Sequence, residues 1–217
     1  MSKVYCISGL GVDERAFSQL HFKDVEMVHI PWLDFKPNEG LKDYAYRLYQ
    51  QMEVEDNYHL MGLSLGGMIA QEIAKIHPPK HLFLLSTATK PEDISRIRLL
   101  GKIRIQYLLP DYLLTHTNAF LNWYFGVKSK TTKVILKEMM ADADPTFIRR
   151  AITAIVEWQG GNLSKGDPCK THVIHGAADR LIPMRKDTDV VFPNGGHLVI
   201  LEKGEAISQY IEQQIKP

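Results

Sequence analysis

Three side chains that lie far apart in the sequence could together carry out nucleophilic catalysis. Ser64 lies in Gly62-Leu63-Ser64-Leu65-Gly66-Gly67, between a short apolar run and a segment whose apolar residues recur at helical spacing. Asp179 and His197 each follow a later predicted strand. A serine hydroxyl is a weak nucleophile unless a base takes its proton. A neutral imidazole suits that role, and a carboxylate can orient the imidazole. These residue types therefore indicate acyl transfer through a serine.

The glycines on either side of Ser64 predict a tight turn from a strand into a helix. Gly62 lies two residues before the serine and Gly66 two residues after it, and only residues without a Cβ fit where the turn crowds the backbone. Such a turn lifts the hydroxyl clear of the sheet, beside a helix N-terminus that favours negative charge. The alternative is an ordinary glycine-rich turn between a strand and a helix.

A second glycine-rich loop, Ser8-Gly9-Leu10-Gly11, follows the predicted strand over residues 3–7. A dinucleotide-binding loop would need a third glycine where Glu14 stands, and no phosphate-binding lysine follows either loop. We therefore expect no nucleotide cofactor. The loop could instead offer a backbone N–H to an oxyanion, or it could be a plain connection between a strand and a helix.

The remaining pattern predicts a doubly wound α/β sheet of about six mostly parallel strands. Strands alternate with helices up to about residue 89, and the alternation resumes after about residue 165. The predicted strands cover residues 3–7, 25–32, 57–61, 81–85, 171–174 and 189–192, and a closing helix covers 198–215. Because the carboxyl ends of parallel strands share one edge, Ser64, Asp179 and His197 should meet in one crevice.

Residues 90–165 interrupt this alternation with about four predicted helices, over residues 94–109, 111–125, 131–141 and 145–158. We predict a helical cap at 90–165, inserted in a core formed by 1–89 and 166–217. Basic residues in its first half favour a solvated face, with an anionic substrate or a membrane surface as alternatives. Candidate residues of an apolar acyl pocket, for each of which internal packing is the favoured alternative, are Trp123, Tyr124, Phe125, Met139, Met140 and Trp158.

Composition excludes several classes of protein. The chain has 217 residues, with 26 basic and 25 acidic side chains. Because these charges nearly cancel, the overall charge does not indicate nucleic acid as a partner. No apolar run approaches the roughly 20 residues that span a bilayer, and the N-terminal apolar run is too short for a secretory signal. We expect a cytoplasmic protein without membrane insertion. Cys6 and Cys169 are predicted to be buried thiols, and no metal-ligand spacing is present.

The motifs together resemble the α/β-hydrolase fold, in a short, cap-bearing serine esterase form. The resemblance lies in the segment around Ser64, in residues 176–183 around Asp179, and in Gly195-Gly196-His197. It implies a triad of Ser64, His197 and Asp179, with the backbone N–H groups of Leu10 and Leu65 as oxyanion donors. Two features depart from the family. Ser8-Gly9 stands where the family usually has His-Gly, and the family's first two strands are missing, so six strands are expected in place of eight.

The resemblance implies hydrolysis of a carboxylic ester of a small to medium apolar acyl group, with thioesters and lactones as related substrates. His197 is the expected base, with His175 as the alternative, and Asp179 the expected acid, with Asp187 and Asp189 as surface charges. Two other functions remain open. One is C–C bond hydrolysis or a lyase reaction on the same fold. The other is a ligand-binding sensor or scaffold with little catalysis. The oligomeric state cannot be predicted from the sequence.

Overall fold

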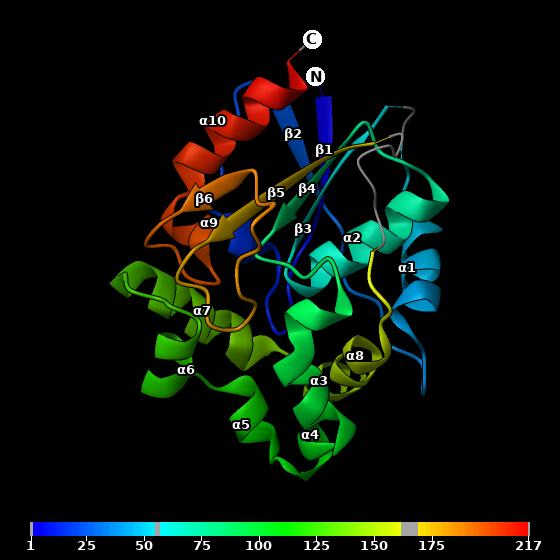
Figure 1. The fold of residues 1–217 in the computed structure, drawn as a ribbon, viewed down its shortest axis with the longest axis vertical. Coiled ribbons are helices and arrows are strands. Elements are labelled where there is room, and N and C mark those ends of the chain that lie inside the picture. The colour runs from blue at the N-terminus through cyan, green and yellow to red at the C-terminus, as the bar shows by residue number, and fades with distance from the viewer. Residues whose placement is uncertain (1, 55–56, 162–168, 217) are drawn as a thin grey trace.

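A single parallel sheet of six strands forms the centre of the molecule (Figure 1). The computed structural model describes residues 2–54, 57–161 and 169–216. The strands are β1 (Ser2–Ile7), β2 (Val25–His29), β3 (His59–Leu63), β4 (His81–Leu85), β5 (Lys170–Gly176) and β6 (Val190–Phe192). Their order is β2-β1-β3-β4-β5-β6, and all five neighbouring pairs are parallel. The predicted doubly wound six-stranded sheet is confirmed.

Helices cover both faces of the sheet. Helices α1 (Leu41–Tyr49) and α2 (Leu65–Ile76) lie on one face, and the 3-10 helix η1 (Glu14–Phe17), α9 (Val199–Glu202) and α10 (Gly204–Ile215) lie on the other (Figure 1). Successive residues of β4 alternate between two apolar clusters, since Leu82 and Leu84 belong to the first and Phe83 and Leu85 to the second. This burial on both faces explains why the strands read as continuous apolar runs.

The described residues between β4 and β5 form helices and turns. These helices are η2 (Pro91–Ile94), α3 (Ser95–Lys102), α4 (Ile105–Leu108), α5 (Asp111–Thr115), α6 (Ala119–Tyr124), α7 (Lys130–Asp142) and α8 (Pro145–Glu157). Leu136 of α7 joins the cluster on the α10 face, and Ile155 of α8 joins the cluster on the α2 face. The insertion's predicted end at residue 165 lies outside the described residues.

Several predicted elements have different bounds in the structure. The helix predicted over 94–109 breaks at Arg104, whose φ of +55° is left-handed and cannot continue a right-handed helix. The helix predicted over 111–125 stops at Thr115 and restarts where the Asn118 side chain caps α6. The closing helix is split at Lys203 into α9 and α10. The predicted strand over 25–32 ends at His29.

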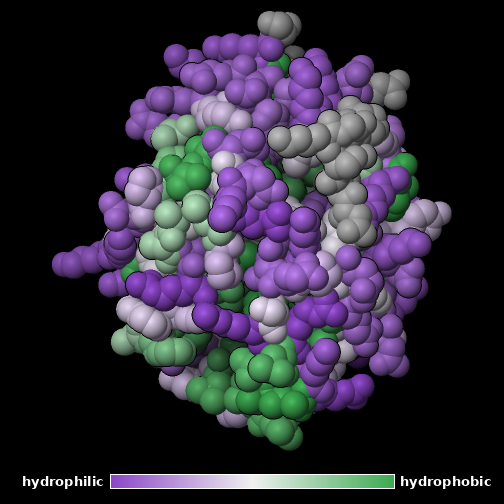
Figure 2. Space-filling model, in the orientation of Figure 1, coloured by the Kyte–Doolittle hydropathy of each residue, from purple (hydrophilic) through white to green (hydrophobic). Residues whose placement is uncertain are grey.

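Apolar side chains gather on the surface over helices α3 to α5, at the lower end of the molecule in Figure 2. The exposed members include Leu99, Leu100, Ile103, Tyr107, Leu108 and Tyr112. Leu100 also lines the internal cavity described below, so this surface adjoins the cavity wall. Among the described residues, no helix has the length and apolarity needed to cross a bilayer.

Candidate active site

Ser64 occupies the turn between β3 and α2, in a strained backbone conformation. Its φ of 52° and ψ of −116° are unusual for a residue with a side chain, and such strain persists only where the surroundings enforce it. Two hydrogen bonds hold the turn in place: the Ser64 N–H donates to the Leu85 carbonyl at 2.9 Å, and the Thr87 hydroxyl donates to the Ser64 carbonyl at 2.5 Å. The serine is therefore fixed against β4.

Gly66 is required because α2 begins directly against β1. A Cβ on Gly66 would overlap the carbonyl groups of Ile7 and Ser8. One residue further along the helix, a Cβ on Gly67 would lie 2.5 Å from the Thr87 side chain. The two glycines thus allow the helix to start close enough to the sheet to hold Ser64 at its carboxyl edge.

His197 lies within hydrogen-bonding distance of both Ser64 and Asp179. Its Nε2 is 2.9 Å from Ser64 Oγ, and its Nδ1 is 2.8 Å from Asp179 Oδ2. The histidine follows β6, and its backbone N–H donates to the Phe125 carbonyl at 2.8 Å, while its ring packs on the Phe125 ring at 5.9 Å between centroids. The structure therefore brings the three predicted residues into one hydrogen-bonded line, with the imidazole in the middle.

Asp179 is a buried carboxylate with four hydrogen-bonding contacts. Oδ1 accepts the N–H groups of Leu181 and Ile182 at 2.9 and 3.0 Å, and Oδ2 faces the imidazoles of His197 and His175. Burial raises the pKa of Asp179, but the charge of His197 and the hydrogen bonds from both histidines outweigh burial and hold it well below its usual range. The group therefore stays ionised near neutral pH, as an orienting carboxylate must.

His175 supports the loop that carries Asp179. Its Nε2 lies 2.8 Å from the Ile182 carbonyl oxygen and 3.1 Å from Asp179 Oδ2. A carbonyl oxygen only accepts, so Nε2 carries a hydrogen and donates it. The ring that lies within hydrogen-bonding distance of Ser64 Oγ is that of His197, the expected base, and not that of the alternative, His175.

Two backbone segments flank Ser64 where an oxyanion would form. Leu65 is the first residue of α2, so no carbonyl one turn earlier in the helix can accept its N–H. The loop after β1 passes close by, since a Cβ on Gly9 would lie 3.4 Å from the Cβ of Ser64. Ser8, which stands where the family usually has histidine, closes this loop by donating its hydroxyl to the Val12 carbonyl at 3.0 Å.

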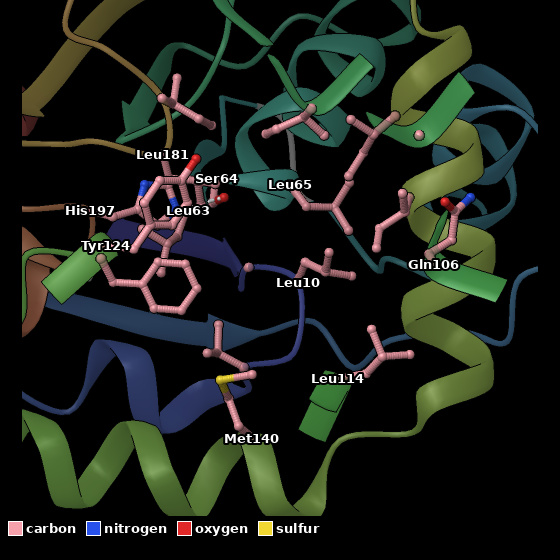
Figure 3. A pocket seen from close by; sticks show the side chains of 18 of the residues that line it. Leu10, Leu63, Ser64, Leu65, Gln106, Leu114, Tyr124, Met140, Leu181 and His197 are labelled. Atoms are coloured by element: carbon pink, nitrogen blue, oxygen red, sulfur yellow. Dashed lines mark hydrogen bonds between the residues drawn. The ribbon is translucent and has the colours of Figure 1, made fainter. Parts of the chain in front are cut away.

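An apolar cavity of about 310 Å³ extends from Ser64 and His197 (Figure 3). Its walls come from the β1 loop, the turn at Ser64 and helices α3 to α8. Three of the candidates proposed from the sequence, Tyr124, Phe125 and Met140, line it. Its other lining residues are not among the candidates proposed from the sequence, and they include Ile97, Ile105, Gln106, Leu109, Leu114, Ile152, Ile155 and Leu181. The apolar residues of α8 recur at helical spacing in the sequence, but this spacing does not show which of them face a cavity.

The other three candidates lie elsewhere. Trp123 is 56% exposed, and the Arg180 guanidinium stacks over its ring at 4.5 Å. Met139 is buried beside a second, smaller cavity. Trp158 is buried, and its indole N–H donates to Glu72 at 2.7 Å. None of the three is among the residues that line the Ser64 cavity.

The doubly wound sheet, with a serine between a strand and the helix that follows it, defines an α/β enzyme of the hydrolase type. The model of the alpha/beta hydrolase family matches residues 4–209, and the chain belongs to this family. No curated protein matches the sequence.

Solved structures of this fold cover almost the whole chain. A lipase-esterase related protein from Clostridium acetobutylicum is 14% identical, with a TM-score of 0.76, covering 99% of this chain and 94% of its own. An enol-lactonase from Burkholderia xenovorans is 15% identical, with a TM-score of 0.68, and the match covers 98% of this chain and 90% of the enol-lactonase. A thermophilic esterase from Thermogutta terrifontis is 17% identical, with a TM-score of 0.65, and the match covers 99% of this chain and 89% of the esterase. At these identities the likeness establishes the fold.

Proposed function

We propose that the protein is a serine hydrolase that cleaves carboxylic esters through an acyl-enzyme on Ser64. The observation that carries this proposal is the pair of distances at His197, 2.9 Å to Ser64 Oγ and 2.8 Å to Asp179 Oδ2. These are hydrogen-bond distances suited to proton transfer from the hydroxyl to the imidazole. A pure ligand-binding protein would gain nothing from such an arrangement.

In the proposed acylation step, His197 Nε2 takes the proton of Ser64 as Oγ attacks the ester carbonyl carbon. The electron pair of the carbonyl moves onto its oxygen, which the N–H groups of Leu10 and Leu65 stabilise. Collapse of this intermediate breaks the bond to the alcohol, which leaves with the proton from His197. Asp179 stabilises the imidazolium throughout. A water molecule then repeats the sequence on the acyl-enzyme and releases the acid.

The cavity supports a small to medium apolar acyl group as the substrate. Its walls are mostly leucine, isoleucine and methionine, and burial of an alkyl chain against them is favourable by about 0.8 kcal/mol for each methylene. Thioesters and lactones pass through the same tetrahedral intermediate and are substrates of the same chemistry.

We further propose that residues 90–165 act as a cap over the site. Helices α3 to α8 supply much of the cavity wall, so variation there would change the substrate without changing the triad. A cytoplasmic location is consistent with Cys6 and Cys169, which are both free and buried.

The proposal is tested by hydrolysis of the p-nitrophenyl esters of acetate, butyrate, octanoate and laurate. We expect turnover by the wild type, with a decline for chains too long for the cavity. Ser64→Ala and His197→Ala should each lower kcat by about a thousandfold or more. The matched controls Ser18→Ala and His21→Ala change exposed residues and should keep wild-type rates. No turnover of any ester, with a reactive Ser64, would instead favour C–C bond hydrolysis or a lyase reaction.

A further inference from the structure

Gln106 is a polar residue in the apolar wall of the Ser64 cavity. It belongs to the short helix α4, is only 2% exposed and lines the cavity together with Ser64 and His197. Its amide oxygen Oε1 is buried and has no hydrogen-bond partner among the described residues. Most of the other lining residues are apolar, so the unpaired oxygen has little else to bond within the cavity wall.

The hydrogen bonds around Thr153 determine which way the amide of Gln106 faces. The Thr153 hydroxyl donates its one proton to the Arg149 carbonyl at 3.0 Å, so towards Gln106 its oxygen can only accept. The group that faces it at 3.3 Å must therefore be the NH₂ of Gln106. Figure 3 shows the result: the amide nitrogen points away from the cavity, and the amide oxygen is on the cavity side.

An unpaired carbonyl beside an apolar cavity is unfavourable until a donor reaches it. An alkyl chain cannot supply a donor, whereas a hydroxyl or amide N–H can. We propose that Gln106 determines specificity by accepting a hydrogen bond from such a donor on the substrate. This inference rests on the proposed function and narrows the substrate class to esters that carry a distal hydrogen-bond donor.

The geometry assigns the donor to the acyl part of the ester. His197 must protonate the leaving alcohol, so the alcohol lies on the side of His197. Figure 3 places His197 and Gln106 at opposite ends of the cavity, with Leu10 and Leu65 between them. An acyl chain bound to Ser64 would therefore extend past these two leucines towards Gln106, and its far end would meet the amide oxygen.

The test compares p-nitrophenyl esters of straight-chain acids that end in a methyl group with esters of equal length that end in a hydroxyl or an acetamido group. In the wild type we expect the donor-ended esters to be preferred in kcat/KM by about 10-fold or more, at the one chain length that reaches Gln106. In Gln106→Met, which keeps the length of the side chain, the ratio of kcat/KM for donor-ended esters to that for methyl-ended esters of equal length should fall to about 1. Gln159→Met, at an exposed glutamine, is the control and should retain the wild-type preference.

A second variant tests the orientation of the amide. Thr153→Val removes the acceptor that holds the Gln106 nitrogen, and should weaken the preference for donor-ended esters without abolishing turnover. This variant and the dependence on chain length in the wild type also test the inference if Gln106→Met does not fold.

Three results would overturn the inference. The first is equal kcat/KM for donor-ended and methyl-ended esters at every length, and the second is an unchanged preference in Gln106→Met. The third is a preference that appears only when the hydroxyl is placed on the leaving alcohol, which would contradict the assignment to the acyl chain. In all three the esters are hydrolysed, so the proposed function stands. A complete lack of ester turnover would overturn both proposals together.

Discussion

The ring nitrogen Nε2 of His175 lies 3.1 Å from Oδ2 of Asp179, the same carboxylate oxygen that contacts His197 at 2.8 Å. His175 also donates to the Ile182 carbonyl at 2.8 Å, and Ile182 in turn donates its N–H to Asp179 Oδ1. The Asp179 carboxylate is thus held by backbone N–H groups of its own loop and by the His175 side chain at the end of β5. We infer that His175 is a positioning residue that keeps Asp179 aimed at His197.

We predict that His175→Ala lowers kcat by about tenfold with little change in KM, because a misplaced Asp179 orients His197 less well but does not alter the cavity. His175→Gln, whose amide can donate from nearly the same position, should recover part of the rate. Steady-state kinetics on a p-nitrophenyl ester measure both constants. A wild-type kcat in His175→Ala, or a change confined to KM, would contradict the positioning role.

Replacing Gly66 by alanine should destabilise the protein by about 3 kcal/mol or more, since the new methyl group overlaps the backbone of Ile7 and Ser8, which cannot move without disturbing β1. Urea unfolding measures the effect. The matched control is Gly40→Ala at the start of α1, where an added Cβ meets nothing within 4 Å, and its free energy of unfolding should change by less than about 0.5 kcal/mol. Equal stability of the two variants would refute the close packing of α2 on β1.

Stability should decrease below neutral pH because of two neighbouring histidines in the sheet. His59 and His81 are register partners on β3 and β4, and burial lowers the pKa of each to about 4. An unfolded histidine titrates near pH 6.5, so between about pH 6.5 and pH 4 the unfolded chain binds more protons. The free energy of unfolding then falls as pH drops, by up to about 1.4 kcal/mol per pH unit for each histidine.

Urea unfolding between about pH 7 and pH 5 tests this pH dependence. His59→Leu removes one of these groups, and also a buried Nδ1 that has no hydrogen-bond partner among the described residues. The free energy of unfolding should therefore vary less steeply with pH, without loss of stability at pH 7. His81 keeps its contact with His172 at 3.0 Å in this variant. A slope identical to that of the wild type would show that His59 is not one of the responsible groups.

The preferred length of the acyl chain should shorten when the cavity is narrowed. Leu114 of α5 lines the cavity, and Leu114→Trp would fill part of its volume. We expect kcat/KM for octanoate to fall by about tenfold or more while the value for acetate stays within about twofold. Val134→Trp, on the exposed face of α7, is the control and should leave the profile unchanged. If Leu114→Trp lowers kcat/KM by the same factor for all the esters, the acyl chain does not occupy this cavity.

That the candidate residues Ser64, Asp179 and His197 lie together could be predicted because strand topology determines where they lie. Ser64, Asp179 and His197 each lie in a short segment with glycine close by, directly after a strand, and parallel strands bring such segments to one edge. That reasoning needs only the order of strands and turns, which the apolar runs of the sequence reveal.

The cavity wall could not be predicted in the same way. Trp123 and Trp158 looked like pocket residues because they are aromatic, yet one stacks under Arg180 at the surface and the other bonds the buried Glu72. Which side of a short helix faces the cavity depends on breaks such as the one at Arg104, where a left-handed residue redirects the chain. Gln106 follows this break by two residues, and nothing in its local sequence marks it as a cavity residue.

The most direct measurement of the central claim is the rate at which a fluorophosphonate probe labels the protein, with the modified residue identified by mass spectrometry. We predict that the wild type is labelled at Ser64, that Ser64→Ala is not labelled, and that His197→Ala is labelled at least about a hundredfold more slowly. Labelling of His197→Ala at the wild-type rate, or of the wild type at a residue other than Ser64, would contradict the activation of Ser64 by His197.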